Sequence, residues 1–215
     1  MTPKAKSKTK AAAAPERTYH HGDLRRALVA AAIELLRAEG AEALTLRAVA
    51  RAAGVSQAAP YRHFADRRAL VAAVAEEGFR GLGDEMSRAM AEAMRSGNMR
   101  LAFREVGLAY VRFALQHPAE YRVMFGAEVA NHQDLPGLRA RSHAVLDGVA
   151  QAVAGLQQAR LVGAGDPGTM AAALWATLHG LVMLSLDGQT TGVVASLDAL
   201  VDEALRLVMF GMAPR

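Results

Sequence analysis

Apolar residues recur at helical spacing along most of the chain. Between residues 24 and 36, for example, intervals of three to four residues separate Leu24, Leu28, Ala31 and Leu35. Glycine, proline or short polar clusters interrupt the pattern near residues 40, 54, 65–66, 96–98, 117–118, 126–136, 163–167 and 188–192. The pattern predicts an all-α protein of about nine helices, in which one long helix over about 67–95 links an N-terminal part to a larger C-terminal part.

Residues 45–64 predict a helix-turn-helix. Thr45 can cap a first helix, and one apolar stripe follows it at Leu46, Val49, Ala50 and Ala53. Gly54 can adopt the positive φ that ends a helix, and Ser56 can cap a second helix that runs to about Phe64. From spacing alone, an ordinary helical hairpin with a solvated polar face is the alternative.

The expected second helix carries side chains that suit a DNA groove. It begins with Ser56, Gln57 and Ala58, which are small or polar and would let the backbone approach base edges. Gln57 can hydrogen-bond those edges, and Tyr61, Arg62 and His63 can reach phosphates beside them. Asp66 can cap the next helix, so Arg67 and Arg68 would lie at its N-terminus. Cations are disfavoured there, which makes sense if both arginines face a phosphate.

Residues 22–70 resemble the DNA-binding domain of the TetR (tetracycline repressor) family of bacterial transcription regulators. The matching stretches are GDLRRALVAAAIELLRAEG, TLRAVARAAGVS, YRHF and FADRRALVAAVAEEGF. By this resemblance, the operator-contacting positions are Thr45, Arg47, Ser56, Gln57, Ala58, Tyr61, His63 and Arg67. Two residues depart from the family pattern, because Arg67 replaces a frequent lysine and Pro60 replaces an aliphatic residue.

The resemblance also implies an organisation and a function. Residues 1–18 would be a disordered basic tail, 19–66 the helix-turn-helix DNA-binding domain, and 67–215 a helical domain for ligand binding and dimerisation. The expected protein is a cytoplasmic, homodimeric repressor that leaves a palindromic operator when a small-molecule effector binds. An activator, a ligand-independent repressor, and a small helical enzyme or binding module that kept the head are the alternatives.

Charge and composition agree with a DNA-binding head. Residues 1–80 hold 14 Lys and Arg against 8 Asp and Glu, whereas residues 81–215 hold 11 against 13. Only the first part therefore suits a polyanion. Lysines at positions 4, 6, 8 and 10 make the tail either a solvated leader or a basic arm along DNA phosphates.

Several kinds of chemistry find no support in the sequence. The chain has no cysteine, so it cannot form disulfides, thiolate nucleophiles or cysteine-bound zinc sites. His20, His21, His132 and His143 have no partner at metal-ligand spacing, and we expect tail or loop histidines there. With no nucleophile motif and no phosphate-binding glycine loop, we expect no catalytic residues, no metal and no cofactor.

Residues 170–186 carry no formal charge, which admits a membrane span or a helix buried on all sides. The stretch is short for a span and lacks flanking Lys or Arg clusters, so we expect a helix buried between its own domain and a second subunit. It contains Trp175, His179 and Gly180, which resemble a Trp-His-Gly pattern in the C-terminal domain of one TetR subgroup. Residues 113–118 and 121–126 fit the same subgroup.

Aromatic residues near two isolated histidines, His117 and His179, predict a pocket in the C-terminal part. The expected ligand-binding residues are Tyr110, Phe113, Tyr121, Phe125, Trp175 and His179. A mostly apolar cavity of this kind would take a small hydrophobic or aromatic effector. Either histidine can instead be a core residue bonded to a backbone carbonyl. Met86, Met90 and Met94 share one helix face, where core packing is the default and a ligand wall the alternative.

The last two helices, expected over about 166–187 and 196–210, predict the dimer interface. They place many apolar side chains at helical spacing, more than one subunit of this size readily covers. The expected interface residues are Leu181, Leu184, Leu197, Leu200, Val201 and Leu205. A two-fold axis would present two recognition helices to one face of a palindromic operator.

Overall fold

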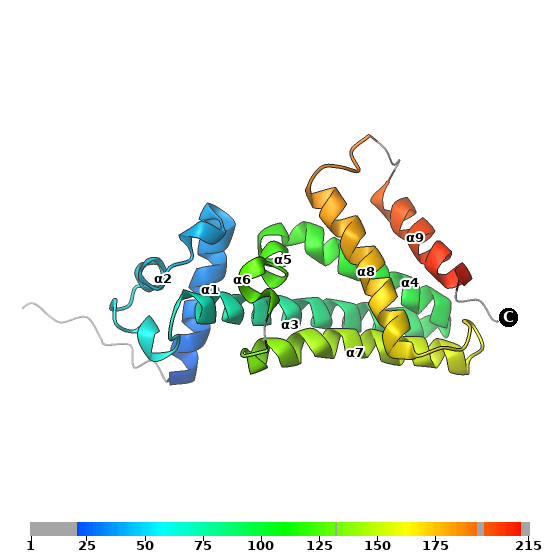
Figure 1. The fold of residues 1–215 in the computed structure, drawn as a ribbon, viewed down its shortest axis with the longest axis horizontal. Coiled ribbons are helices and arrows are strands. Elements are labelled where there is room, and N and C mark those ends of the chain that lie inside the picture. Colours follow the sequence, from blue (N-terminus) through cyan, green and yellow to red (C-terminus); the bar gives the residue numbers. More distant parts are fainter. Residues whose placement is uncertain (1–20, 132, 193–195, 212–215) are drawn as a thin grey trace, which may run out of the picture.

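The computed structural model describes residues 21–131, 133–192 and 196–211, with the side chains of 24–208 among them. The expected basic tail, residues 1–18, lies outside the described residues. All regular structure in the described part is helical, which confirms the predicted fold class (Figure 1). The elements are α1 (His21–Glu39), η1 (Ala41–Ala43), α2 (Leu46–Ala52), η2 (Pro60–Arg62), α3 (Arg67–Ala93), η3 (Met94–Ser96), α4 (Met99–Gln116), α5 (Pro118–Met124), α6 (Ala127–Ala130), α7 (Pro136–Gln158), α8 (Pro167–Leu186) and α9 (Leu197–Gly211).

Helix α3 is the predicted linking helix. It runs the length of the molecule, from the small helices at one end to α4 and α7, which lie along it (Figure 1). Asp66 caps it, because its carboxylate accepts a hydrogen bond from Ala69 N at 2.8 Å. Ten of its residues are buried, so α3 contributes to the cores at both ends of the molecule.

The head consists of α1, α2 and the turns around them, packed on the start of α3. Thr45 caps α2 as predicted, since its hydroxyl accepts from Ala48 N at 3.1 Å. Gly54 has a φ of 68°, the left-handed conformation that the sequence required at this turn. The core of the head is formed by Leu28, Leu36, Leu44, Val49 and Phe64, all of them buried.

The prediction that the second helix of the helix-turn-helix is an α-helix is wrong. Residues 56–64 make a series of turns around the single 3-10 turn η2, and no α-helix runs from Ser56 to Phe64. The cause is Pro60, the first position whose N–H would bond back to Ser56 O in an α-helix. The Ser56 carbonyl instead accepts from Ala59 N at 3.0 Å, an i→i+3 bond that tightens the turn.

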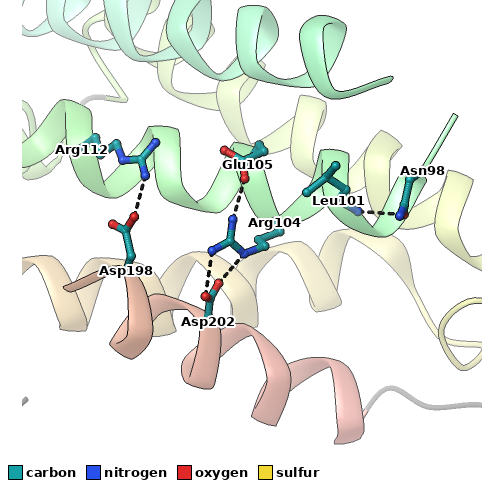
Figure 2. A network of polar contacts seen from close by, with 7 residues as sticks. All are labelled: Asn98, Leu101, Arg104, Glu105, Arg112, Asp198 and Asp202. Atoms are coloured by element: carbon teal, nitrogen blue, oxygen red, sulfur yellow. Dashed lines mark hydrogen bonds and ion pairs between the residues drawn. The ribbon is translucent and has the colours of Figure 1, made fainter. Parts of the chain in front are cut away.

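The larger part of the molecule packs α4, α5 and α7 on α3, α8 on α7 and α4, and α9 on α4 and α8. Two ion pairs join α4 to α9 (Figure 2). Arg104 binds Asp202 through Nε and Nη2 at 2.6 and 2.8 Å, and Arg112 Nη2 binds Asp198 at 2.7 Å. The guanidinium of Arg104 lowers the pKa of Asp202 below its ordinary value. The Asp202 carboxylate therefore stays ionised, and keeps this bidentate pair, to a lower pH than a carboxylate without a cationic partner would.

By length and composition, α8 is apolar enough to cross a membrane, with a mean hydropathy of 1.5. Its neighbours in the molecule are α7, α4 and α9, so it forms part of a helical bundle. Only 28% of its apolar window is buried in the single subunit. One subunit therefore covers only part of α8, and burial of the rest by a second subunit stays a prediction.

An ion pair between a buried carboxylate and a half-exposed guanidinium joins the head to the larger domain. Glu120 of α5 is 4% exposed, and Arg37 at the end of α1 binds its Oε1 through Nε at 2.6 Å. His117 Nδ1 lies 3.7 Å from the same oxygen. A carboxylate at this depth is tolerated only while it has a cationic partner.

Arg37→Ala is therefore expected to destabilise the protein by about 2–3 kcal/mol, because it leaves the Glu120 carboxylate buried without its guanidinium. Urea denaturation measures the effect. Arg88→Ala is the matched control, since it breaks an exposed pair with Glu85 and should cost less than about 0.5 kcal/mol. Adding Glu120→Gln to Arg37→Ala should recover part of the loss. If the changes in unfolding free energy caused by Arg37→Ala and Glu120→Gln simply added, the pairing of Arg37 with Glu120 would be contradicted.

Candidate functional site

Most predicted DNA contacts lie on one exposed surface of the head, which we call the α2–η2 surface. Its members from the prediction are exposed: Thr45, Arg47, Ser56, Gln57, Ala58 and Tyr61. The Tyr61 ring is 53% exposed although it is aromatic. His63 differs from them, because it is half-buried and its Nε2 is sealed from solvent without a hydrogen-bond partner among the described residues.

The arginines of the head fall into two groups. Arg47, Arg51 and Arg62 are exposed on the α2–η2 surface and form no hydrogen bond or ion pair with any residue that the structure describes. Arg51 was not singled out from the sequence, although its place in the last turn of α2 follows from the helical spacing. All three guanidinium groups are therefore open to solvent.

Arg67 and Arg68 form the other group and are directed into the protein. Arg67 donates from Nε to Leu44 O at 2.8 Å and from Nη2 to Ala41 O at 2.8 Å, and its Nη1 binds the carboxylate of Glu128. The guanidinium predicted to hold a phosphate is thus engaged with acceptors of η1, of the loop after it, and of α6. We leave Arg67 out of the α2–η2 surface for this reason.

Arg68 makes equivalent contacts one residue further along α3. It donates to Glu128 O at 3.1 Å and to Asn131 O at 2.8 Å, and it pairs with the carboxylate of Asp134. The two arginines together hold the segment around α6 against the N-terminus of α3. The expectation that both face a phosphate is replaced by this internal role.

The second site is a cavity of about 470 Å³ between α3, α4, α7 and α8. Most of its lining is apolar, and residues of α5, α6 and α9 also contribute to it. The lining residues are Phe79, Leu82, Met86, Phe103, Val106, Gly107, Tyr110, Met124, Phe125, Val129, Ala130, Ser142, His143, Val145, Leu146, Val149, Leu174, Trp175, Leu178, His179 and Leu205. A cavity of this size and character can hold a small organic molecule.

Four of the six predicted ligand residues line the cavity, namely Tyr110, Phe125, Trp175 and His179. Tyr121 lies behind them, fully buried, and its hydroxyl reaches the His179 ring. Phe113 lies outside the lining and stacks on His117, with ring centroids 4.8 Å apart. His117 in turn belongs to the Glu120 ion pair and takes no part in the pocket.

Sequence reasoning missed the contribution of α7 to the cavity. His143, expected to be a tail or loop histidine, lies on this helix and lines the wall. Met86 is buried and also lines the cavity, whereas Met94, at the end of the same stripe, is 39% exposed. Helical spacing identifies a face of a helix but cannot say which distant helix the face meets.

Four polar side chains form a chain of hydrogen bonds along one wall. Trp175 Nε1 donates to Tyr110 Oη at 3.1 Å, the hydroxyls of Tyr110 and Tyr121 are 2.6 Å apart, and Tyr121 Oη lies 2.7 Å from His179 Nδ1. Burial raises the pKa of Tyr110 to about 12 and also raises that of Tyr121. Burial lowers the pKa of His179, so the neutral imidazole is favoured at pH 7.

The predicted dimer residues divide by burial. Leu181, Val201 and Leu205 are covered by their own subunit, and Leu205 also lines the cavity. Leu197 and Leu200 are partly buried, while Leu184 is 53% exposed. Leu207, which the prediction omitted, is 58% exposed on α9. Among the described residues, no cluster of His, Asp or Glu could hold a metal ion.

Comparisons with known proteins match both parts of this chain. Residues 28–74 match the family model of the tetR family of bacterial regulatory proteins, and residues 103–208 match that of a tetracyclin repressor-like C-terminal domain. Among proteins of curated function, none matches the chain.

Solved structures share the fold. A protein of unknown function from Rhodococcus sp. RHA1 is 38% identical, with a TM-score of 0.79 over 92% of this chain and 100% of that one. A TetR family transcription regulator from Marinobacter aquaeolei VT8 is 21% identical, with a TM-score of 0.66 over 89% and 96%. The fatty acid degradation regulator FadR from Bacillus halodurans is 14% identical, with a TM-score of 0.70 over 89% and 97%.

Proposed function

The chain belongs to the tetR family of bacterial regulatory proteins, and we propose that it is a ligand-responsive repressor that acts as a homodimer in the cytoplasm. As a member of this family it is a DNA-binding transcription regulator, and such regulators are in general not enzymes. We further propose that its C-terminal domain belongs to the subgroup with the Trp-His-Gly pattern. Its effector would be a small hydrophobic or aromatic molecule held in the cavity, and its binding would release the operator.

One observation carries the ligand-responsive part of this proposal. Helix α6 lies between the cavity and the head: Val129 and Ala130 line the cavity, and the preceding Glu128 binds Arg67. Arg67 also holds the carbonyls of Ala41 and Leu44, just before α2. A molecule that displaced Val129 would move Glu128 on the same helical turn and disturb the contacts that set the position of α2.

An effector can act only through a difference in its affinity for two arrangements of the protein. In the present arrangement the wall of the cavity and the support of the head share α6, so filling the cavity and moving the head are physically linked. Linkage then requires the reciprocal effect, in which operator DNA weakens the binding of the effector by the same factor.

We assign operator contacts to the α2–η2 surface. Gln57, at its centre, is exposed and carries both a donor and an acceptor, as base recognition needs. Around it, Arg47, Arg51 and Arg62 have no internal partner among the residues described, and Tyr61 exposes its ring. These four residues would contact phosphates and set the register of the head on DNA.

The dimer would form across the exposed faces of α8 and α9. Leu184 and Leu207 are large apolar side chains left in solvent, and most of the apolar window of α8 is uncovered in one subunit. At Gly180 no atom lies within 4 Å of where a Cβ would be, so a second backbone can approach α8 closely there. Pairing two subunits would present two heads to a palindromic operator.

The head is tested by separating base contacts from phosphate contacts. Gln57→Ala should weaken binding to a selected operator by about 1–3 kcal/mol and change binding to random DNA little. Arg51→Ala and Tyr61→Phe should weaken both by similar factors, and Arg51→Ala should also reduce the salt dependence. Fluorescence anisotropy at several salt concentrations measures each. Equal losses on operator and random DNA for Gln57→Ala would contradict this division of roles.

The link through α6 is tested with Glu128→Gln, which keeps the shape of the side chain and removes its charge. Compounds that raise the melting temperature of the wild type should also weaken its operator binding. In the variant, the coupling free energy between compound and operator should be smaller by about 0.5–2 kcal/mol. Glu85→Gln, which alters an exposed pair on α3, is the control. The proposal fails if no stabilising compound changes operator affinity, and the route through α6 fails if the variant keeps full coupling.

The dimer is tested by placing charges on the exposed face. Leu184→Glu with Leu207→Glu should give a folded monomer that binds operator at least tenfold more weakly, because two unpaired carboxylates would have to be buried in the interface. Gln151→Glu, an exposed change on α7, which is not one of the two helices of this interface, provides a comparison. Sedimentation and circular dichroism give the oligomeric state and the fold. A wild-type monomer at micromolar concentration would rule the interface out.

A further inference from the structure

The wall of the cavity contains no charged side chain. Its polar side chains are Tyr110, Ser142, His143, Trp175 and His179, and the rest of the lining is apolar. A carboxylate or ammonium group that entered would lose its hydration and meet no counter-charge, which is strongly unfavourable. The wall therefore favours an uncharged molecule, and its polar side chains decide which polar group that molecule can carry.

Only one direction of the hydrogen-bond chain along the wall gives every proton in it an acceptor among the described residues. The indole N–H of Trp175 can only donate, so the hydroxyl oxygen of Tyr110 accepts. The proton of Tyr110 is then available to Tyr121 Oη at 2.6 Å, and the proton of Tyr121 goes to His179 Nδ1 at 2.7 Å. In the reverse direction the hydroxyl proton of Tyr110 would have no acceptor among the described residues, at a buried position where that is costly.

This direction fixes the tautomer of His179. Since Nδ1 accepts from Tyr121, a neutral ring carries its proton on Nε2. Nε2 has no hydrogen-bond partner in the described part of the chain, and it is not sealed from solvent as His63 Nε2 is. Tyr121 lies outside the cavity lining and His179 lies within it. The edge of the ring away from Tyr121 is therefore the edge that borders the cavity.

The other polar groups of the wall are already engaged. The hydroxyl protons of both tyrosines and the indole N–H of Trp175 are used within the chain of hydrogen bonds, and Ser142 Oγ donates to Arg139 O at 3.1 Å. His143 takes part in an interaction of its own. Within the chain of hydrogen bonds, His179 Nε2–H is the donor that is held in place and still open to a ligand.

We propose that the cavity selects an uncharged, mainly apolar molecule with one hydrogen-bond acceptor, such as a ketone or ester carbonyl, which His179 Nε2–H binds. Tyr121, which lies outside the lining, is a positioning residue, because it acts on the ligand only by holding the tautomer of His179. Trp175 and Tyr110 line the cavity and also fix the direction of the hydrogen-bond chain. The inference rests on the proposed function for its site, since it specifies the chemistry of the effector, but its binding test needs no DNA.

The test uses four nine-carbon probes of similar length: 2-nonanone, nonane, nonanoate and nonylamine. Trp175 is the single tryptophan of the chain and lines the cavity, so its fluorescence reports occupancy in the full-length protein. 2-Nonanone should bind about five- to tenfold more tightly than nonane, as one added hydrogen bond allows. Nonanoate and nonylamine should bind more weakly than the ketone. Tighter binding of either charged probe, or no binding of 2-nonanone, would overturn the proposal.

Substitutions then assign the preference to His179. His179→Phe combined with Tyr121→Phe and Tyr110→Phe keeps the ring shapes and removes both hydroxyls of the hydrogen-bond chain, so neither is left buried and unpaired. Nonane should then still bind, and the ketone preference should fall to about onefold. Thr177→Val is the matched control, because it removes a hydroxyl from α8 outside the cavity lining and should keep the preference. A ketone preference that survives the triple substitution would overturn the role of His179.

Nitrogen NMR of the imidazoles tests the positioning residue without any ligand. The wild type should show His179 as the neutral Nε2–H tautomer, and Tyr121→Phe should release that ring to a mixture of tautomers. An Nδ1–H tautomer in the wild type would overturn the argument. If the ketone binds selectively and operator affinity does not change, the effector mechanism fails and the binding inference stands.

Discussion

The guanidinium of Arg67, on the long helix α3, binds both the head and α6, the helix that forms part of the cavity wall. Arg67 is the first residue of α3, at the positive end of the helix dipole, where a cation is disfavoured by up to about 1 kcal/mol. Three acceptors offset this cost: the carbonyls of Ala41 and Leu44 and the carboxylate of Glu128. A planar group with donors in several directions serves all three at once, which a lysine ammonium at this position would do less well. The position of the head therefore depends on α6.

The same constraint decides which arginines remain for DNA. Arg37, Arg67 and Arg68 each have a carboxylate partner in the larger domain, so they join the two parts of the molecule. Within the head, the arginines for which the described residues supply no partner are Arg47, Arg51 and Arg62, on α2 and η2. The head thus separates its charges by function: one group is neutralised at the domain junction, and the other is left available to a polyanion. The net charge of residues 1–80 alone could not reveal this division.

Local chemistry explains which features could be predicted from the sequence. Thr45, Gly54 and Asp66 were assigned correctly, because caps and glycine turns depend on atoms within three or four residues. The form of residues 56–64 was wrong for an equally local reason, since Pro60 occupies the position that must donate the first α-helical hydrogen bond. The partners of Arg67 and Arg68 could not be predicted, because Glu128 and Asp134 follow them by more than 60 residues. The place of His143 in the cavity wall depends on how α7 packs on α3, a property of the tertiary fold.

Helix α8 shows why hydropathy alone does not identify an environment. Its uncharged sequence is compatible with a membrane, a subunit core or an interface, and only its contacts distinguish them. Ala171, Leu174, Leu178, Leu181 and Val182 are buried, while Leu184 and Ala176 are exposed on another side of the same helix. Trp175 and His179 lie between these sides and border the cavity. A molecule in the cavity thus contacts the helix that would carry the dimer interface, and a shift of α8 would change the angle between two subunits. The effector would then act on the spacing of the two heads through α8 as well as on each head through α6.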